Sequence, residues 1–131
     1  MCIFCEIIKG NIPSKKVYED SNVVAILDIS QATKGHTLII PKKHYDNLLN
    51  IEEDDLLNAS KVIKIVTNKI NKAYSPKGFN ILNNCNEIAG QSVMHFHIHV
   101  IPRYESNDLI IEPKNNVDKY NLDEILNDLN K

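Results

Sequence analysis

The stretch that decides the fold is His95-Phe96-His97-Ile98-His99-Val100-Ile101, in which histidines and apolar residues alternate. Successive side chains of a β-strand point to opposite faces of a sheet, so this alternation predicts one histidine face and one apolar face. We therefore expect a strand over residues 93–101, ended by Pro102, that buries Phe96, Ile98 and Val100 and presents three imidazoles to a site.

These three histidines favour chemistry over packing. Histidine rarely serves as buried filler, and neighbouring imidazoles avoid mutual repulsion when they stay neutral and hydrogen-bonded. Two other interpretations stay open: histidines on a half-exposed strand, and a metal site built from these three alone. A spread of roughly 13 Å along a strand makes convergence on one ion awkward.

Composition predicts a single domain over residues 1–131 that binds no nucleic acid. The 131 residues are 43% apolar, enough for one core but small enough that a site can lean on a second subunit. The formal charge is −2 from 15 basic and 17 acidic residues, which are well mixed and form no basic footprint. Arg103 is the one arginine, so a phosphate site would have to use backbone N–H groups, hydroxyls and imidazoles.

The chain carries no signal for export or membrane insertion. No run approaches 18 apolar residues, and the N-terminus has neither a basic region nor a small-residue cleavage site. Its three cysteines, Cys2, Cys5 and Cys85, form no disulfide framework. We therefore expect a cytoplasmic protein with no membrane partner.

The remaining pattern predicts an α+β domain: a five-stranded antiparallel sheet with one main amphipathic helix and a C-terminal helix. Strands are expected over 15–19, 23–27, 36–40, 79–82 and 93–101. Helices are expected over 5–9, over 56–74 behind the acidic run 52–55, and over 122–129 with Asn121 as its cap. The polar loop 83–92 adjoins the histidine strand, and such loops are often functional.

The histidine stretch resembles the His-φ-His-φ-His-φ-φ signature of the histidine-triad (HIT) family of nucleotide hydrolases and transferases. Residues 28–30 (Asp-Ile-Ser), 35–44 and 90–93 (Gly-Gln-Ser-Val) look like the family's other landmarks, in the family's order. The resemblance covers about residues 2–103 and is closest to the purine-nucleotide-binding branch. It implies a HIT-like fold and a homodimer that meets through the helix 56–74 and the strand 79–82.

The same resemblance implies a hydrolase that cleaves the α-phosphate linkage of nucleoside 5′-phosphoramidates or related conjugates and releases a purine nucleoside monophosphate. His97 would attack phosphorus and form a covalent nucleotidyl-histidine. His99 would stand near the leaving group, where transferase relatives carry glutamine, while His95 and His36 would support the network. Two alternatives stay open: a dinucleoside polyphosphate hydrolase, and a nucleotide-binding module without catalysis.

Further residues are expected to hold the nucleotide. Backbone N–H groups around Gly90 can approach an anion closely, with the Gln91 amide and the Ser92 hydroxyl adding contacts. By similarity, Asn84 would lie near the α-phosphate and Asp28 would accept both ribose hydroxyls. Similarity also assigns the slot for the base, with core packing as the alternative, to Phe4, Ile7 and Ile29.

The pair Cys2-x-x-Cys5 has half the spacing of a zinc site, which alone also suits redox chemistry or two unrelated small residues. Some bacterial members of the family hold zinc with such a pair, the histidine after the Pro-Lys-Lys stretch and the first triad histidine. The resemblance thus implies Cys2, Cys5, His44 and His95 as ligands. Four protein ligands would make the zinc structural. No organic cofactor is expected.

Overall fold

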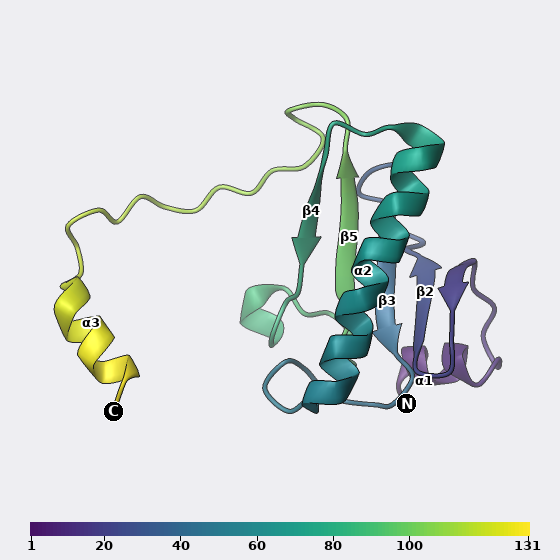
Figure 1. Cartoon of the computed structure of the whole chain (residues 1–131), viewed down its shortest axis with the longest axis horizontal. Helices are drawn as coiled ribbons and strands as arrows, with labels where there is room; N and C mark the ends of the chain where they lie inside the picture. Colours follow the sequence, from purple (N-terminus) through teal and green to yellow (C-terminus); the bar gives the residue numbers. More distant parts are fainter.

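Five antiparallel strands form one open sheet in the order β1-β2-β3-β5-β4, in a computed structural model that describes residues 1–131 (Figure 1). The strands are β1 (Lys16–Glu19), β2 (Val23–Leu27), β3 (Thr37–Pro41), β4 (Gly78–Leu82) and β5 (Ile98–Arg103). The helices are α1 (Ile3–Ile8), α2 (Glu53–Tyr74), the 3-10 turn η1 (Glu87–Ala89) and α3 (Leu122–Leu129). The expected fold class is confirmed.

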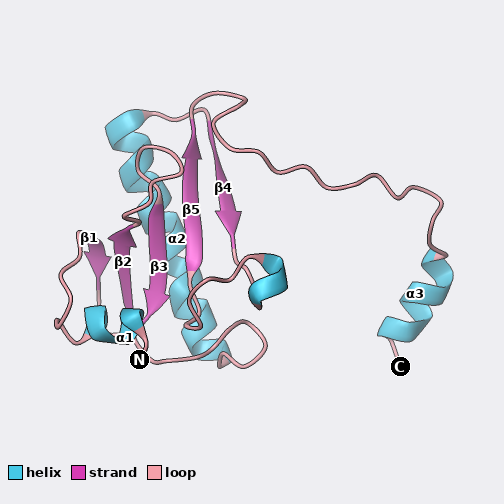
Figure 2. Ribbon diagram, turned by 180° about the vertical axis from the view of Figure 1, so that it is seen from behind, coloured by secondary structure: helices cyan, strands magenta, loops and turns pink.

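The long helix α2 covers one face of the sheet (Figures 1 and 2). It begins with three acidic residues at the positive end of its dipole and ends at Tyr74, and the next residue, Ser75, adopts a left-handed conformation with φ 47° just before Pro76. Ala59, Val62, Val66 and Ile70 recur on its buried side. The apolar residues that recur every three or four positions therefore form the side of α2 that contacts the sheet.

The two faces of the sheet form two cores. Along β2, Val23 and Ala25 pack in the core under α2, whereas Val24 and Ile26 pack in the core beside α1. In β5, Ile98 and Val100 likewise face α2. The histidines that alternate with them therefore share the α1 face, as the alternation predicts.

The expected strand 93–101 is wrong at its start and at its end. Regular pairing begins only at Ile98, opposite Ile39, because the N–H of Phe96 donates to the Tyr45 carbonyl at 2.7 Å instead of to a neighbouring strand. At the other end, β5 continues through Pro102 to Arg103. Pairing with β3 stops at Val100, so the missing N–H of proline removes no bond to that strand.

The first helix and the polar loop also differ from expectation. Helix α1 begins at Ile3, two residues earlier than expected, because the Cys2 sulfur accepts the N–H of Cys5 and caps it. The loop 83–92 contains the turn η1. Both differences lie beside the histidines.

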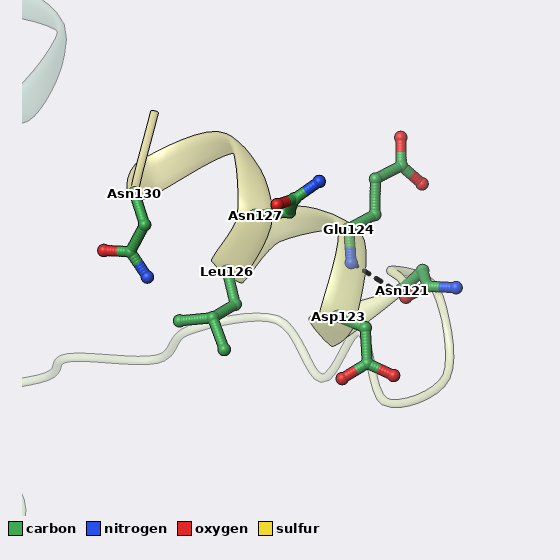
Figure 3. A pocket seen from close by; sticks show the side chains of 6 residues that line it. All are labelled: Asn121, Asp123, Glu124, Leu126, Asn127 and Asn130. Atoms are coloured by element: carbon green, nitrogen blue, oxygen red, sulfur yellow. Dashed lines mark hydrogen bonds between the residues drawn. The ribbon is translucent and has the colours of Figure 1, made fainter.

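The C-terminal part leaves the body of the domain. After an irregular segment, α3 forms over the expected residues, and the Asn121 side chain accepts the Glu124 N–H at 3.1 Å (Figure 3). Every residue from Ile110 to Lys131 is exposed, and α3 stands beyond β4 (Figures 1 and 2). None of the helices combines the length and apolarity needed to cross a bilayer.

Candidate active site and metal centre

A cavity of about 280 Å³ opens on the α1 face, beside the start of β5. The sequence-predicted residues that line it are Phe4, Ile7, Asp28, Ile29, Ser92, His97 and His99. Its wall is mostly apolar and also includes a carboxylate, a hydroxyl and two imidazoles. This combination suits a ligand with an apolar ring and a polar, anionic end.

His97 lies in this wall with one ring nitrogen already engaged. Its Nδ1 lies 2.7 Å from the His95 carbonyl oxygen, to which only an N–H can donate. The other nitrogen, Nε2, therefore holds a lone pair in the neutral ring. Burial lowers the pKa of His97 below its ordinary value, and the Phe4 ring packs edge-on against it at 5.1 Å. The ring is thus a neutral base at physiological pH with a defined tautomer.

His99 and His36 form a second chain of defined hydrogen bonds. The Ala32 N–H donates to His36 Nδ1 at 3.1 Å, so the hydrogen of the neutral His36 ring sits on Nε2. That nitrogen lies 2.9 Å from His99 Nδ1, which leaves the hydrogen of His99 on its own Nε2. Burial lowers the pKa of His36, and burial together with His97 and His36 lowers the pKa of His99 to about 4. His99 thus offers an N–H where His97 offers a lone pair.

Asp28 follows β2 and keeps one carboxylate oxygen available at the cavity. Its Oδ1 accepts the Ser30 N–H at 2.8 Å, and its Oδ2 lies 3.6 Å from His36 Nε2, beyond a normal hydrogen bond. Ile29, next in sequence, is fully exposed at the cavity rim. Asp28 and Ile29 therefore line the same cavity, a carboxylate next to an apolar side chain.

The loop 83–92 differs from the expected phosphate cradle. The N–H groups of Gly90 and Gln91 donate within the loop, to the carbonyls of Glu87 and Asn86. The Gln91 side chain is buried: its amide donates to the Asp46 and Val93 carbonyls at 2.6 and 3.0 Å. These groups brace the loop, and of the three expected residues 90–92 only Ser92 lines the cavity.

Gly90 and Asn84 contact each other within the loop and do not line the cavity. Gly90 has φ 101°, and a Cβ there would lie 3.2 Å from the Asn84 Nδ2. The Asn84 side chain itself donates to the Gly90 carbonyl at 3.4 Å, and it does not line the cavity. The neighbouring Asn83 was not among the expected residues, yet its amide donates to the His97 carbonyl at 2.9 Å. Its position directly after Leu82, which pairs with His99, was the available signal.

A second cluster lies next to the first and brings together Cys2, Cys5, His44 and His95. Their ligand atoms all lie within 4.8 Å of one another. The two His Nδ1 atoms are 3.1 Å apart, and the Cys5 sulfur lies 3.4 Å from His44 Nδ1 and 3.5 Å from His95 Nδ1. The Cys2 sulfur also lies 3.5 Å from His95 Nδ1.

These separations fit a tetrahedral zinc ion. Bond lengths of about 2.05 Å to nitrogen and 2.3 Å to sulfur place ligand atoms about 3.4 Å apart for two nitrogens and about 3.6 Å for nitrogen and sulfur. His95 Nε2 lies 2.8 Å from the Pro41 carbonyl and His44 Nε2 lies 3.0 Å from Asp46 Oδ1, so both Nδ1 atoms are left as acceptors. Two acceptors 3.1 Å apart need a cation or a shared proton between them.

Comparison with known proteins gives the relationships of this chain. The family model described as "HIT domain" matches residues 9–106. An uncharacterised HIT-like protein of Methanocaldococcus jannaschii is 46% identical over 129 residues, covering 98% of both chains. "Protein hit" of Bacillus subtilis is 50% identical over 107 residues, covering 82% of this chain and 74% of the relative. The adenosine 5′-monophosphoramidase hnt1 of Schizosaccharomyces pombe is 39% identical over 102 residues, covering 78% and 74%.

Solved structures resemble the chain over different lengths. A HIT family protein from Bacillus anthracis has a TM-score of 0.93 and 45% identity, covering 98% of this chain and 92% of that one. A zinc-bound histidine triad family protein from Mycobacterium smegmatis has a TM-score of 0.79 and 33% identity, covering 90% and 86%.

Proposed function

Because this chain belongs to the HIT family, we propose that it hydrolyses the α-phosphate linkage of nucleoside 5′-phosphoramidates or related nucleotide conjugates and releases a purine nucleoside monophosphate. The observation that carries the proposal is the bond between His97 Nδ1 and the His95 carbonyl, which leaves His97 Nε2 as a free lone pair at the cavity. The phosphoramidase activity named for the Schizosaccharomyces pombe relative supports the choice of substrate class.

The reaction would proceed in two displacements at phosphorus. His97 Nε2 attacks the α-phosphorus, an N–P bond forms, and the bond from phosphorus to the leaving group breaks. The leaving amine takes up a proton from solvent, and the Nε2–H of the neutral His99 donates a hydrogen bond to the leaving group without giving up its hydrogen. Water then attacks the nucleotidyl-histidine, breaks the N–P bond and loses a proton to solvent, which returns the neutral His97 and releases the monophosphate.

The cavity supplies the contacts for the nucleotide. In this proposal Asp28 accepts the ribose hydroxyls, Ser92 donates to the phosphate, and the apolar wall of Phe4, Ile7 and Ile29 holds the base. Asn83 would hold the His97 backbone in place through its bond to the His97 carbonyl. Gly90, Gln91 and Asn84 would act on the phosphate only indirectly, by fixing the loop that carries Ser92.

We further propose that Cys2, Cys5, His44 and His95 hold a structural zinc ion. The ligand spacing and the oxygen partners of both imidazoles support it, as does the zinc-bound Mycobacterium smegmatis relative. Four protein ligands leave no open position, so zinc would tie the N-terminus to the segment that carries His97.

The chain is also proposed to form a homodimer through α2 and the edge strand β4. Strand β4 pairs on one side only, and Ile81 on β4 and Leu57 on α2 are 41% and 51% exposed. We expect sedimentation velocity to give the mass of two chains, and Ile81→Lys to shift the population toward monomer. A wild-type mass of one chain at micromolar concentration would reject this dimer.

The decisive test of the proposed activity is a single-turnover reaction with adenosine 5′-phosphoramidate, quenched in time and followed by intact mass. We expect an adduct of one adenylyl group that appears, decays and leaves free AMP. AMP binding with neither adduct nor turnover would favour the nucleotide-binding module instead. Turnover of a dinucleoside polyphosphate alone would favour the alternative hydrolase, since the same nucleophile serves both leaving groups.

A further inference from the structure

The helix α3 carries an apolar face that its own chain does not cover. Leu122, Ile125, Leu126 and Leu129 recur at intervals of three and four residues, so they share one side of the helix. These four side chains are 38–78% exposed, and Figure 3 shows Leu126 projecting from one side of α3 and Glu124 from the other. A helix of 8 residues is marginal in water when it packs against nothing. We therefore expect this apolar face to pack against another surface.

The segment that carries α3 is held to the domain at its start and runs away from the domain beyond that point. At its root, Arg103 pairs with Asp108 and donates to Asn80 Oδ1 at 2.7 Å and to the Leu109 carbonyl at 3.0 Å. Beyond this anchor, residues 110–131 are all exposed and run past β4 (Figures 1 and 2). We call residues 109–131 the C-terminal arm.

A solved relative also matches the C-terminal arm of this chain. The Bacillus anthracis structure matches 98% of the chain with a TM-score of 0.93. The arm is 23 of the 131 residues, so a match over 98% of the chain includes nearly all of it. The arm therefore lies in a similar place in both proteins. An apolar helix that this chain holds away from its own body, in a region that also matches the solved relative, points to a second chain.

A groove on the surface of the domain is lined by apolar side chains, like the exposed face of α3. It is a cavity of about 260 Å³ beside the C-terminal half of α2. Its apolar wall consists of Val17, Leu27, Ile70, Ala73 and Tyr74. Leu27 and Tyr74 are 38% and 46% exposed, so apolar surface is open there. We call it the α2 groove; it lies outside the proposed active-site cavity except for Leu27.

The charges of the two surfaces are complementary. Lys34 and Lys69 line the α2 groove, and no acidic residue does. Helix α3 carries Asp123 and Asp128 beside its apolar face and no basic residue. Docking of α3 would thus place apolar against apolar and carboxylates near ammonium groups.

The arm is long enough to connect two chains. Residues 110–121 can span up to about 40 Å when extended, whereas five strands are about 19 Å across. The root of the arm lies beside the groove of its own chain, since the Tyr104 hydroxyl donates to the Lys34 carbonyl at 2.6 Å. Docking in its own groove would require the arm to turn back on itself. Its course past β4 leads it away from that groove.

We propose that α3 of one chain docks in the α2 groove of a second copy, so that two copies exchange their C-terminal arms. The proposal concerns assembly and stands apart from the proposed hydrolase activity. It adds to the dimer through α2 and β4 a contact made by residues that the HIT domain match, ending at residue 106, does not include.

The test is a photo-crosslink in the full-length chain. Benzoylphenylalanine replaces Leu126, the sample is irradiated, and the products are separated by mass under denaturing conditions and mapped by peptide sequencing. We expect a product of two chains that joins the peptide 122–129 to α2 between residues 69 and 74. The same probe at Asn127, away from the apolar face, should give at least fivefold less of it.

Charge reversal at the groove supplies the matched control. Lys69→Glu should lower the yield of the two-chain product several-fold, whereas Lys9→Glu, exposed at the end of α1 and outside both the groove and the proposed α2 and β4 interface, should leave it unchanged. Products confined to one chain, two-chain products at another surface, or no products would each overturn the proposal. Turnover of the phosphoramidate by the same samples reports separately on the active site.

Discussion

The variant His97→Ala is expected to lose turnover by roughly 10⁴-fold or more, because the attacking nitrogen is removed and no other lone pair replaces it. AMP affinity should stay within about tenfold of wild type, because the nucleophile acts mainly in the transition state. The measurement is steady-state kcat/KM with adenosine 5′-phosphoramidate alongside AMP binding by calorimetry. No adenylyl adduct should appear in intact mass.

A matched variant separates the nucleophile from its structural bond. In His97→Asn the side-chain amide can still donate to the His95 carbonyl, as Nδ1 does, but nothing replaces Nε2. In His97→Ala that carbonyl loses its partner, at a stability cost of about 1–3 kcal/mol. Both variants should be inactive while only alanine lowers the melting temperature. If His97→Asn turned over at the wild-type rate, His97 would be a brace and the proposed mechanism would be wrong.

The spacing of apolar residues along the sequence predicts the main elements of the fold. The alternation in 95–101 placed Phe96, Ile98 and Val100 in the core under α2 and the histidines on the other face, as the structure has them. The three- and four-residue spacing likewise located α2 and α3 to within a few residues. These features follow from local geometry, in which each side chain's direction depends only on its neighbours in the chain.

The hydrogen-bond partners of the residues around the site could not be predicted from local sequence spacing. Gln91 looked like a free amide in a polar loop, but its donors go to Asp46 and Val93, and the former lies 45 residues away in sequence. The strand start at Ile98 depends in the same way on Phe96 bonding to Tyr45. Each outcome is decided by which backbone groups meet after the chain has folded. The tautomers of His97 and His36, which carry the proposed chemistry, belong to this class.

The double variant Cys2→Ser/Cys5→Ser is expected to lose bound zinc and to melt at a lower temperature. A ligand present at 100 times its dissociation constant stabilises the folded state by about 2.7 kcal/mol. For a domain of this size such a loss corresponds to roughly 10 °C in Tm. Zinc per chain by elemental analysis and thermal unfolding with and without a chelator provide the measurement. The chelator should lower the Tm of wild type and leave that of the variant unchanged.

Serine is the informative replacement because it separates the metal from the helix cap. The Cys2 sulfur also accepts the N–H of Cys5 at the start of α1, and a serine hydroxyl performs that capping well. A fall in Tm therefore reports the metal and not the cap. Cys85→Ser, outside the cluster, should keep both zinc and Tm. The rate per folded molecule should fall less than the stability does, because a closed Cys₂His₂ shell leaves no position for substrate. Equal zinc content and equal melting in the double variant and in wild type would refute the site.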